Sequence, residues 1–73
     1  MRYRLDVYAD RECERRGEVL SLSASSDAQA LEQTERVRWR CECAGESRVL
    51  VLSRADGGNR VEVARMGSRR FSV

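Results

Sequence analysis

Short stretches in which polar and apolar side chains alternate constrain the fold of this sequence more than any other feature. The strictest is 36–43, Arg-Val-Arg-Trp-Arg-Cys-Glu-Cys, where the alternation is unbroken. In a helix, Val37 and Trp39 would lie about 200° apart around the axis. In a strand they share one face with Cys41 and Cys43. The pattern therefore predicts a strand over 36–43 with one apolar face.

The same period of two recurs elsewhere in the chain and predicts four further strands. The first two are separated by a charged loop over 10–17 that closes on a glycine. The last two flank the turn 55–59, whose Asp-Gly and Gly-Asn pairs tolerate positive φ. These four strands are expected over 2–9, 18–24, 48–54 and 60–66.

A helix start lies between the second and third predicted strands. Ser26 is a suitable N-cap, and Gln29 three residues later completes a capping box. Asp27 stands at the positive end of the helix dipole. Because 36–43 is expected to be extended, the helix is predicted to be short, over roughly 27–35. Its inward face would carry Ala30, Leu31 and Thr34.

This order predicts one small α+β domain over 1–73. It would hold a single antiparallel sheet of about five strands with one short helix on one face. Residues 66–73, which include Phe71 and Val73, would add an edge strand or form a frayed tail. A chain of this length buries only about 60% of its unfolded surface, which leaves no room for a deep substrate cleft.

The composition excludes most catalytic chemistry. The sequence contains no histidine, so Ser–His and Cys–His dyads are ruled out. No P-loop, dinucleotide-binding or EF-hand motif occurs. We therefore expect a non-enzymatic protein without a cofactor.

The cysteines predict a reducing compartment. Cys13, Cys41 and Cys43 are an odd number, which prevents full disulfide pairing within one chain. Three thiolates are also one ligand short of a structural zinc site. We expect packing thiols, no metal and a cytoplasmic location. No apolar run is long enough to span a membrane, and the N-terminus leads into no signal-peptide core.

The face of the sheet away from the helix is the candidate binding surface. The net charge is only +2, but all fourteen basic residues are arginine. A GC-rich genome would produce this bias, and so would a need to grip carboxylate or phosphate. The alternation places six arginines on this face, together with Asp6, Glu42 and Glu62, and it adds one tyrosine. The candidate partner-binding residues are Arg36, Arg38, Arg40, Arg2, Arg4, Arg60 and Tyr8. The alternative is a solvated face laced with weak cross-strand ion pairs.

The strand predicted over 48–54 is apolar on both sides. Val49, Leu50, Val51 and Leu52 follow one another without a polar residue. A strand covered on both faces has this pattern. One face would pack under the helix, and the other would be covered by a second copy of the chain or by a partner. These residues are therefore the candidates for self-association as a homodimer.

The order of elements over the whole chain resembles small phage-encoded proteins, among them anti-CRISPR inhibitors of type I surveillance complexes. The resemblance is one of topology and size and carries no functional residue over by position. It implies a protein in the host cytoplasm that binds a Cas subunit and blocks DNA access or recruitment. The segments that carry it are Arg2–Ala9, Glu18–Ala24, Ser26–Glu35, Arg36–Cys43 and the Asp56-Gly57-Gly58 turn.

The sequence thus favours a protein-binding module that uses the arginine-bearing face, with an anti-CRISPR inhibitor as its particular form. A nucleic-acid-binding protein that contacts phosphates through the same face is the first alternative, and its binding would weaken steeply with salt. A dimeric structural or assembly protein is the second.

Overall fold

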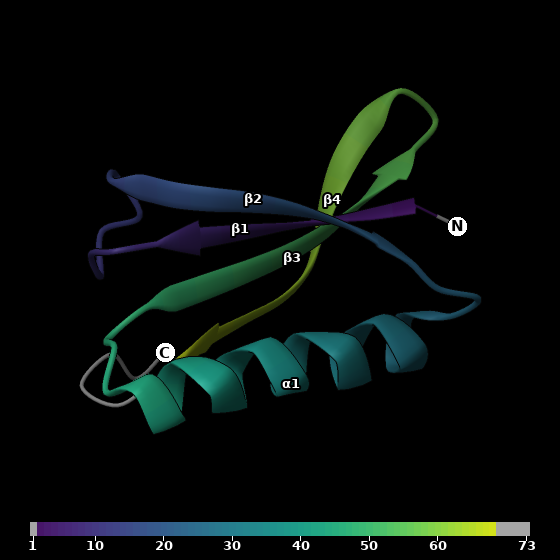
Figure 1. Ribbon diagram of the computed structural model, residues 1–73. Helices are drawn as coiled ribbons and strands as arrows, with labels where there is room; N and C mark the ends of the chain where they lie inside the picture. Colours follow the sequence, from purple (N-terminus) through teal and green to yellow (C-terminus); the bar gives the residue numbers. More distant parts are fainter. Residues whose placement is uncertain (1, 69–73) are drawn as a thin grey trace.

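The computed structural model describes residues 2–68 of the 73-residue chain. Four strands form one antiparallel sheet in the order β2-β1-β3-β4, and one helix lies along one side of it (Figure 1). The predicted α+β class with one antiparallel sheet and one helix is confirmed, but the prediction of five strands is wrong. The elements are β1 (Arg2–Tyr8), β2 (Arg16–Ser23), α1 (Asp27–Ala44), β3 (Val49–Asp56) and β4 (Asn59–Gly67).

The missing strand is part of the helix. Residues 36–43, predicted to be extended, continue α1 to Ala44. The helix then ends at Gly45, whose φ of 74° is left-handed and whose N–H bonds to the carbonyl of Glu42. Trp39, which the strand prediction placed in the core, is consequently 65% exposed.

A helical period underlies the same residues. Ala30, Thr34, Val37 and Cys41 recur at spacings of four, three and four, which places them on one side of a helix. Ala30, Thr34 and Cys41 are buried, and Val37 packs against the core. The arginines at 36, 38 and 40 alternate with apolar residues, and this gives the pattern of a strand within a segment that is helical.

The predicted N-cap is confirmed. The Oγ of Ser26 accepts a hydrogen bond from the backbone N–H of Gln29 at 3.2 Å. In a capping box the side chain of Gln29 would accept from the N–H of the N-cap residue, Ser26. Here its Oε1 accepts instead from the N–H of Ser25, one residue earlier, at 2.7 Å. Both bonds satisfy backbone N–H donors at the N-terminal end of α1.

The core lies between α1 and the two central strands. Leu5 of β1 and Leu50 and Leu52 of β3 are fully buried. The helix contributes Ala30 and Thr34, both without exposed surface. Their small size lets the helix lie close to the sheet, and the hydroxyl of Thr34 is satisfied by the Ala30 carbonyl at 2.9 Å. The predicted inward positions of the helix are therefore correct.

Asp27 fastens the first turn of α1 to the sheet. Its Oδ1 accepts from the hydroxyl of Tyr3 on β1, and its Oδ2 accepts from Nη1 of Arg54 on β3, both at 2.6 Å. The hydrogen bond from Tyr3, followed by the bond and charge of Arg54, lowers the pKa of Asp27. The same hydrogen bond and burial raise the pKa of Tyr3.

The predicted edge strand or tail over 66–73 is only partly within the described residues. Its first two residues belong to β4. Phe71 and Val73 lie outside the described residues. Over 2–68, no helix is long and apolar enough to cross a membrane.

Substitution of two large side chains tests the division into buried and exposed residues. Leu52→Ala removes a side chain with no exposed surface and should lower the free energy of unfolding by about 2–5 kcal/mol. Trp39→Ala should change it by less than about 1 kcal/mol, because Trp39 is largely exposed on α1. Urea unfolding measures both. A large loss in Trp39→Ala would mean that 36–43 packs as a strand after all.

The acid dependence of stability tests the Asp27 contacts. A carboxyl whose pKa is lowered by folding stabilises the protein above its unfolded pKa of about 4 and loses that contribution as the pH falls through the folded value. Asp27→Asn should therefore be less stable than the wild type at pH 7, and the difference should shrink towards pH 2. Urea unfolding at both pH values measures this, and an equal difference at both would contradict the role of the charge.

Candidate anion-binding site

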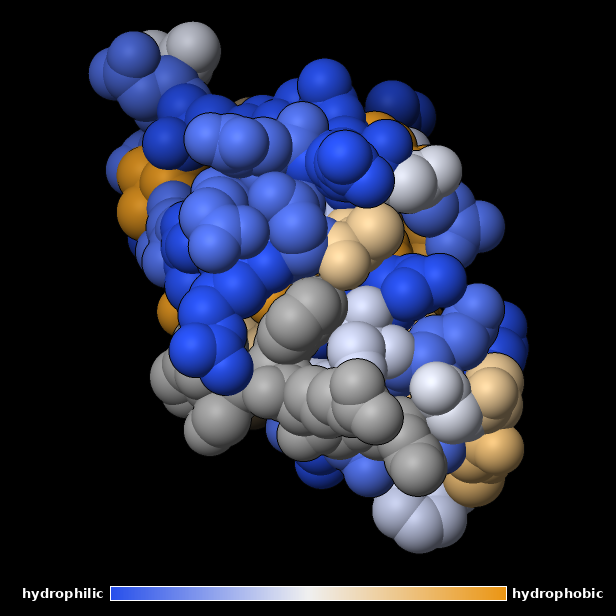
Figure 2. Space-filling view, turned by 90° about the vertical axis from the view of Figure 1, so that its left-hand side faces the viewer, coloured by the Kyte–Doolittle hydropathy of each residue, from blue (hydrophilic) through white to orange (hydrophobic). Residues whose placement is uncertain are grey.

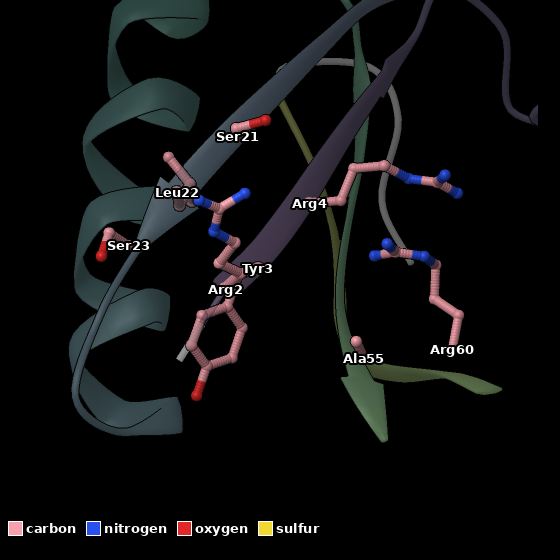
Figure 3. A pocket seen from close by; sticks show the side chains of 8 residues that line it. All are labelled: Arg2, Tyr3, Arg4, Ser21, Leu22, Ser23, Ala55 and Arg60. Carbon is pink, nitrogen blue, oxygen red and sulfur yellow. The ribbon is translucent and has the colours of Figure 1, made fainter. Parts of the chain in front are cut away.

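A hollow of about 590 Å³ lies at the end of the sheet where β1 begins (Figure 3). Its walls come from all four strands, and among residues 2–68 its lining contains three arginines and no aspartate or glutamate. We refer to it as the arginine hollow. The lining residues are Arg2, Tyr3, Arg4, Ser21, Leu22, Ser23, Ala55 and Arg60.

Strand register brings the polar lining residues to one face. Arg4 lies opposite Ser21, and Arg2 lies opposite Ser23, so these side chains share the face of the sheet away from α1. Figure 3 shows Arg4 and Arg60 extending to the same side of the sheet. The serines of β2 are short, and so is Ala55 of β3, which lies between β1 and β4, so the longer arginine side chains stand above their neighbours.

Two of the three guanidinium groups of the hollow bond to other side chains among the described residues, and each does so through one nitrogen. Among residues 2–68, Arg2 makes no side-chain hydrogen bond or ion pair. Arg4 donates through Nε to Asp6 at 3.1 Å, and Arg60 donates through Nη1 to the hydroxyl of Ser53 at 3.1 Å. The two terminal nitrogens of Arg4 therefore remain available to an oxyanion.

Asp6, two residues along β1 from Arg4, positions the Arg4 side chain of the hollow. It lies on the predicted face but is 97% buried, because it accepts from Arg4 at 3.1 Å and from Nη1 of Arg16 at 3.3 Å. A buried carboxylate with two guanidinium partners holds Arg4 in one orientation. It also leaves an excess of positive charge around it.

The predicted set of binding arginines is divided between two sides of the molecule. Arg2, Arg4 and Arg60 line the arginine hollow. The helix carries the other three, so their placement on the sheet was wrong. They are Arg36, Arg38 and Arg40.

Local ion pairs occupy two of the three helix arginines. Arg36 pairs with Glu32 at 3.3 Å, one turn away. Arg38 contacts Glu35 at 2.9 Å and Glu42 at 3.7 Å. Pairs three and four residues apart are typical of an exposed helix surface, and this spacing was a signal of the helix in the sequence.

The far end of the same sheet face is covered by the chain itself. Arg65 of β4 donates from Nη1 to Sγ of Cys13 in the β1–β2 loop at 3.5 Å, and so spans β3. Tyr8, a predicted binding residue, is half-buried beside Val49 at this end. Figure 2 shows the end of the molecule that carries the loop as largely hydrophilic, in agreement with the predicted charged loop. Tyr8 therefore does not join the arginine hollow.

The apolar run of β3 is buried within one chain. Val49, Leu50, Val51 and Leu52 are each at most 9% exposed. Leu50 and Leu52 lie under α1, and the two valines lie on the other face beneath the cover just described. They therefore present little surface to a second copy.

The three thiols occupy different environments. Cys41 is buried against the core, as predicted, and burial raises its pKa. Cys43, predicted to be buried with it, is exposed because the two residues lie about 200° apart on a helix. Cys13 is half-buried in the loop. Within residues 2–68, no three potential metal ligands of the His, Cys, Asp and Glu types converge.

Comparisons with known proteins do not assign the chain to a family. The chain matches no protein-family model, and no curated protein or solved structure was found to be similar to it.

Proposed function

We propose that this chain is a small, non-catalytic protein-binding module that grips acidic side chains of a partner through the arginine hollow. The observation that carries the proposal is that Arg2, Arg4 and Arg60 line one hollow, and that among the described residues its lining contains no acidic side chain. A cluster of guanidinium groups favours carboxylates, because each group offers a fork of donors that matches the two oxygens.

The hollow is suited to binding a protein surface. Its volume of about 590 Å³ is larger than one carboxylate needs, and the hydroxyls of Ser21 and Ser23 offer further hydrogen bonds. Asp6 holds Arg4 in place before binding, which reduces the entropy that Arg4 loses in the complex. Exposed positive charge would also accelerate the encounter with an acidic surface.

The lining residues support binding rather than catalysis. A general acid or base needs a group that exchanges its proton near the working pH. The hollow offers arginine, tyrosine and serine hydroxyls and apolar side chains, none of which ordinarily titrates near neutrality.

The lining also favours a protein over a nucleic acid. Single-stranded nucleic acids are commonly bound by exposed aromatic rings next to basic groups. The aromatic residue of the hollow, Tyr3, is 97% buried, and its hydroxyl is bonded to Asp27. Trp39, which is exposed, belongs to α1 and not to the hollow.

The resemblance to anti-CRISPR inhibitors narrows the proposed partner to a Cas subunit of a type I surveillance complex. Binding would then block DNA access or recruitment. This narrower proposal rests on size and on the order of the other elements, because Arg36–Cys43, one of the segments that carried the resemblance, is helical. Its direct test is co-purification of the chain with such a complex.

Matched charge removal tests the proposal. The double variant Arg2→Gln/Arg60→Gln should weaken binding of a fluorescent octaglutamate peptide at least about tenfold, since each charge-assisted hydrogen bond contributes about 1.5–3 kcal/mol. The control Arg36→Gln/Arg40→Gln removes the same charge from α1 and should change the affinity less than about twofold. Fluorescence anisotropy at constant salt measures both.

Two results would contradict the proposal. Equal losses in the two variants would show that net charge, and not the hollow, governs binding. Tighter binding of a thymidine octanucleotide than of octaglutamate, lost in the hollow variant alone, would favour the nucleic-acid alternative. Thermal unfolding of each variant establishes that the fold is retained.

A further inference from the structure

Strand β2 forms an outer edge of the sheet directly beside the arginine hollow. Among residues 2–68 it pairs with β1 alone, and no other labelled helix or strand runs along its outer edge in Figure 1. Three of its residues, Ser21, Leu22 and Ser23, line the hollow. A ligand in the hollow therefore lies next to an unpaired strand edge.

The C-terminal part of β2 lacks the features that usually protect an edge strand from pairing with another chain. Natural edges carry charges or proline that prevent pairing with another chain. The five residues Val19 to Ser23 read Val-Leu-Ser-Leu-Ser, without either. Among residues 2–68, one side chain bonds to the backbone of this stretch, where Nε2 of Gln33 donates to the carbonyl of Ser23 at 3.0 Å.

Apolar surface is left uncovered on both faces of β2. Val19 is 46% exposed on the face of the hollow. Leu20 and Leu22 pack against the core from the helix face but are only half-buried, whereas Leu5 opposite Leu20 on β1 is fully buried. A further strand would cover all three side chains.

The register of β2 determines which side chains of an added strand reach the hollow. Residues opposite Ser21 and Ser23 would lie on the face of Arg4 and Arg2, because side chains alternate between faces. Neighbouring strands lie about 4.8 Å apart, so an added strand would run about 10 Å from β1. A glutamate and an arginine together span that separation, and the short serines between them leave the path open.

Charge and hydropathy thus specify the occupant of the edge. Side chains on one face of the added strand would meet Arg2 and Arg4 of the arginine hollow, and those on the other would meet Leu20 and Leu22. We propose that β2 accepts an extended segment of the partner as a fifth strand, and that this segment alternates acidic and apolar residues. This inference rests on the proposed function, and it adds the conformation and pattern of the bound segment.

If a partner segment pairs with β2, different contacts supply the affinity and the specificity of binding. Main-chain hydrogen bonds along the edge would supply affinity for any extended segment. The hollow would select acids at every second position, and the half-buried leucines would select apolar residues between them. A peptide with the right composition but the wrong order would lose one of the two contacts.

Amide hydrogen exchange with the unaltered protein tests the inference. The probe is an octapeptide of alternating valine and glutamate, and the control is an octapeptide of four glutamates followed by four valines. The alternating peptide should slow exchange of the outward-pointing amides of Val19–Ser23 at least about tenfold, while the β4 edge stays unchanged. The block peptide should bind more weakly and protect these amides less.

Backbone methylation of the probe adds a second readout. Two versions of the alternating peptide carry N-methyl groups on every second residue, one on the valines and the other on the glutamates. One version should lose binding at least about tenfold, because it removes the donors that face β2, although its charge is unchanged. Equal affinity of both versions and the unmethylated peptide would overturn strand addition.

The remaining outcomes separate this inference from the proposed function. Binding that depends on Arg2 and Arg60 without protection of β2 would overturn the fifth strand and leave the acidic hollow intact. Failure of both peptides and of octaglutamate to bind would overturn both. Protection of β2 without peptide, with a dimer in sedimentation, would assign the edge to a second copy and overturn the acidic segment.

Discussion

The paired contacts of Asp27 determine how the two layers of this protein meet. One carboxylate, at the beginning of α1, accepts 2.6 Å hydrogen bonds from Tyr3 and Arg54 on the two central strands. The helix is thereby fixed over Leu5 and Leu52, which have no exposed surface. Because a single helix covers this face of the sheet, the opposite face must be closed by other means or remain open.

The opposite face is closed at one end and open at the other, and this difference positions the candidate site. At one end, Arg65 reaches Cys13 across β3 and the valines beneath are buried. At the other end, Arg2, Arg4 and Arg60 line the arginine hollow together with the short side chains of Ser21, Ser23 and Ala55. Between the two ends, buried Asp6 draws in Arg4 and Arg16. The arginine hollow is therefore the uncovered remainder of a face that the chain otherwise closes by itself.

The sequence predicted correctly those elements for which all local patterns indicate the same structure. The alternation of β1, the cap at Ser26 and the Asp-Gly turn each indicated one structure, and each is present. Residues 36–43 carry two periods at once, because arginine fills both the alternate positions of a strand and the outer positions of a helix. The spacing of Val37 and Cys41 and the Glu–Arg pairs one turn apart favoured the helix. The alternation placed Arg2, Arg4 and Arg60 on one face of the sheet, but the hollow that they line depends on strand order, which no local pattern encodes.

The side-chain nitrogen signals of the arginines test the central claim, that acidic groups bind at the hollow. Nitrogen-edited NMR spectra should be recorded while octaglutamate is added at constant salt. The account predicts that the Nε–H signals of Arg2, Arg4 and Arg60 shift together and saturate at one peptide concentration, while those of Arg36 and Arg38 remain in place. Equal, non-saturating shifts of all arginines, or shifts confined to α1, would contradict it.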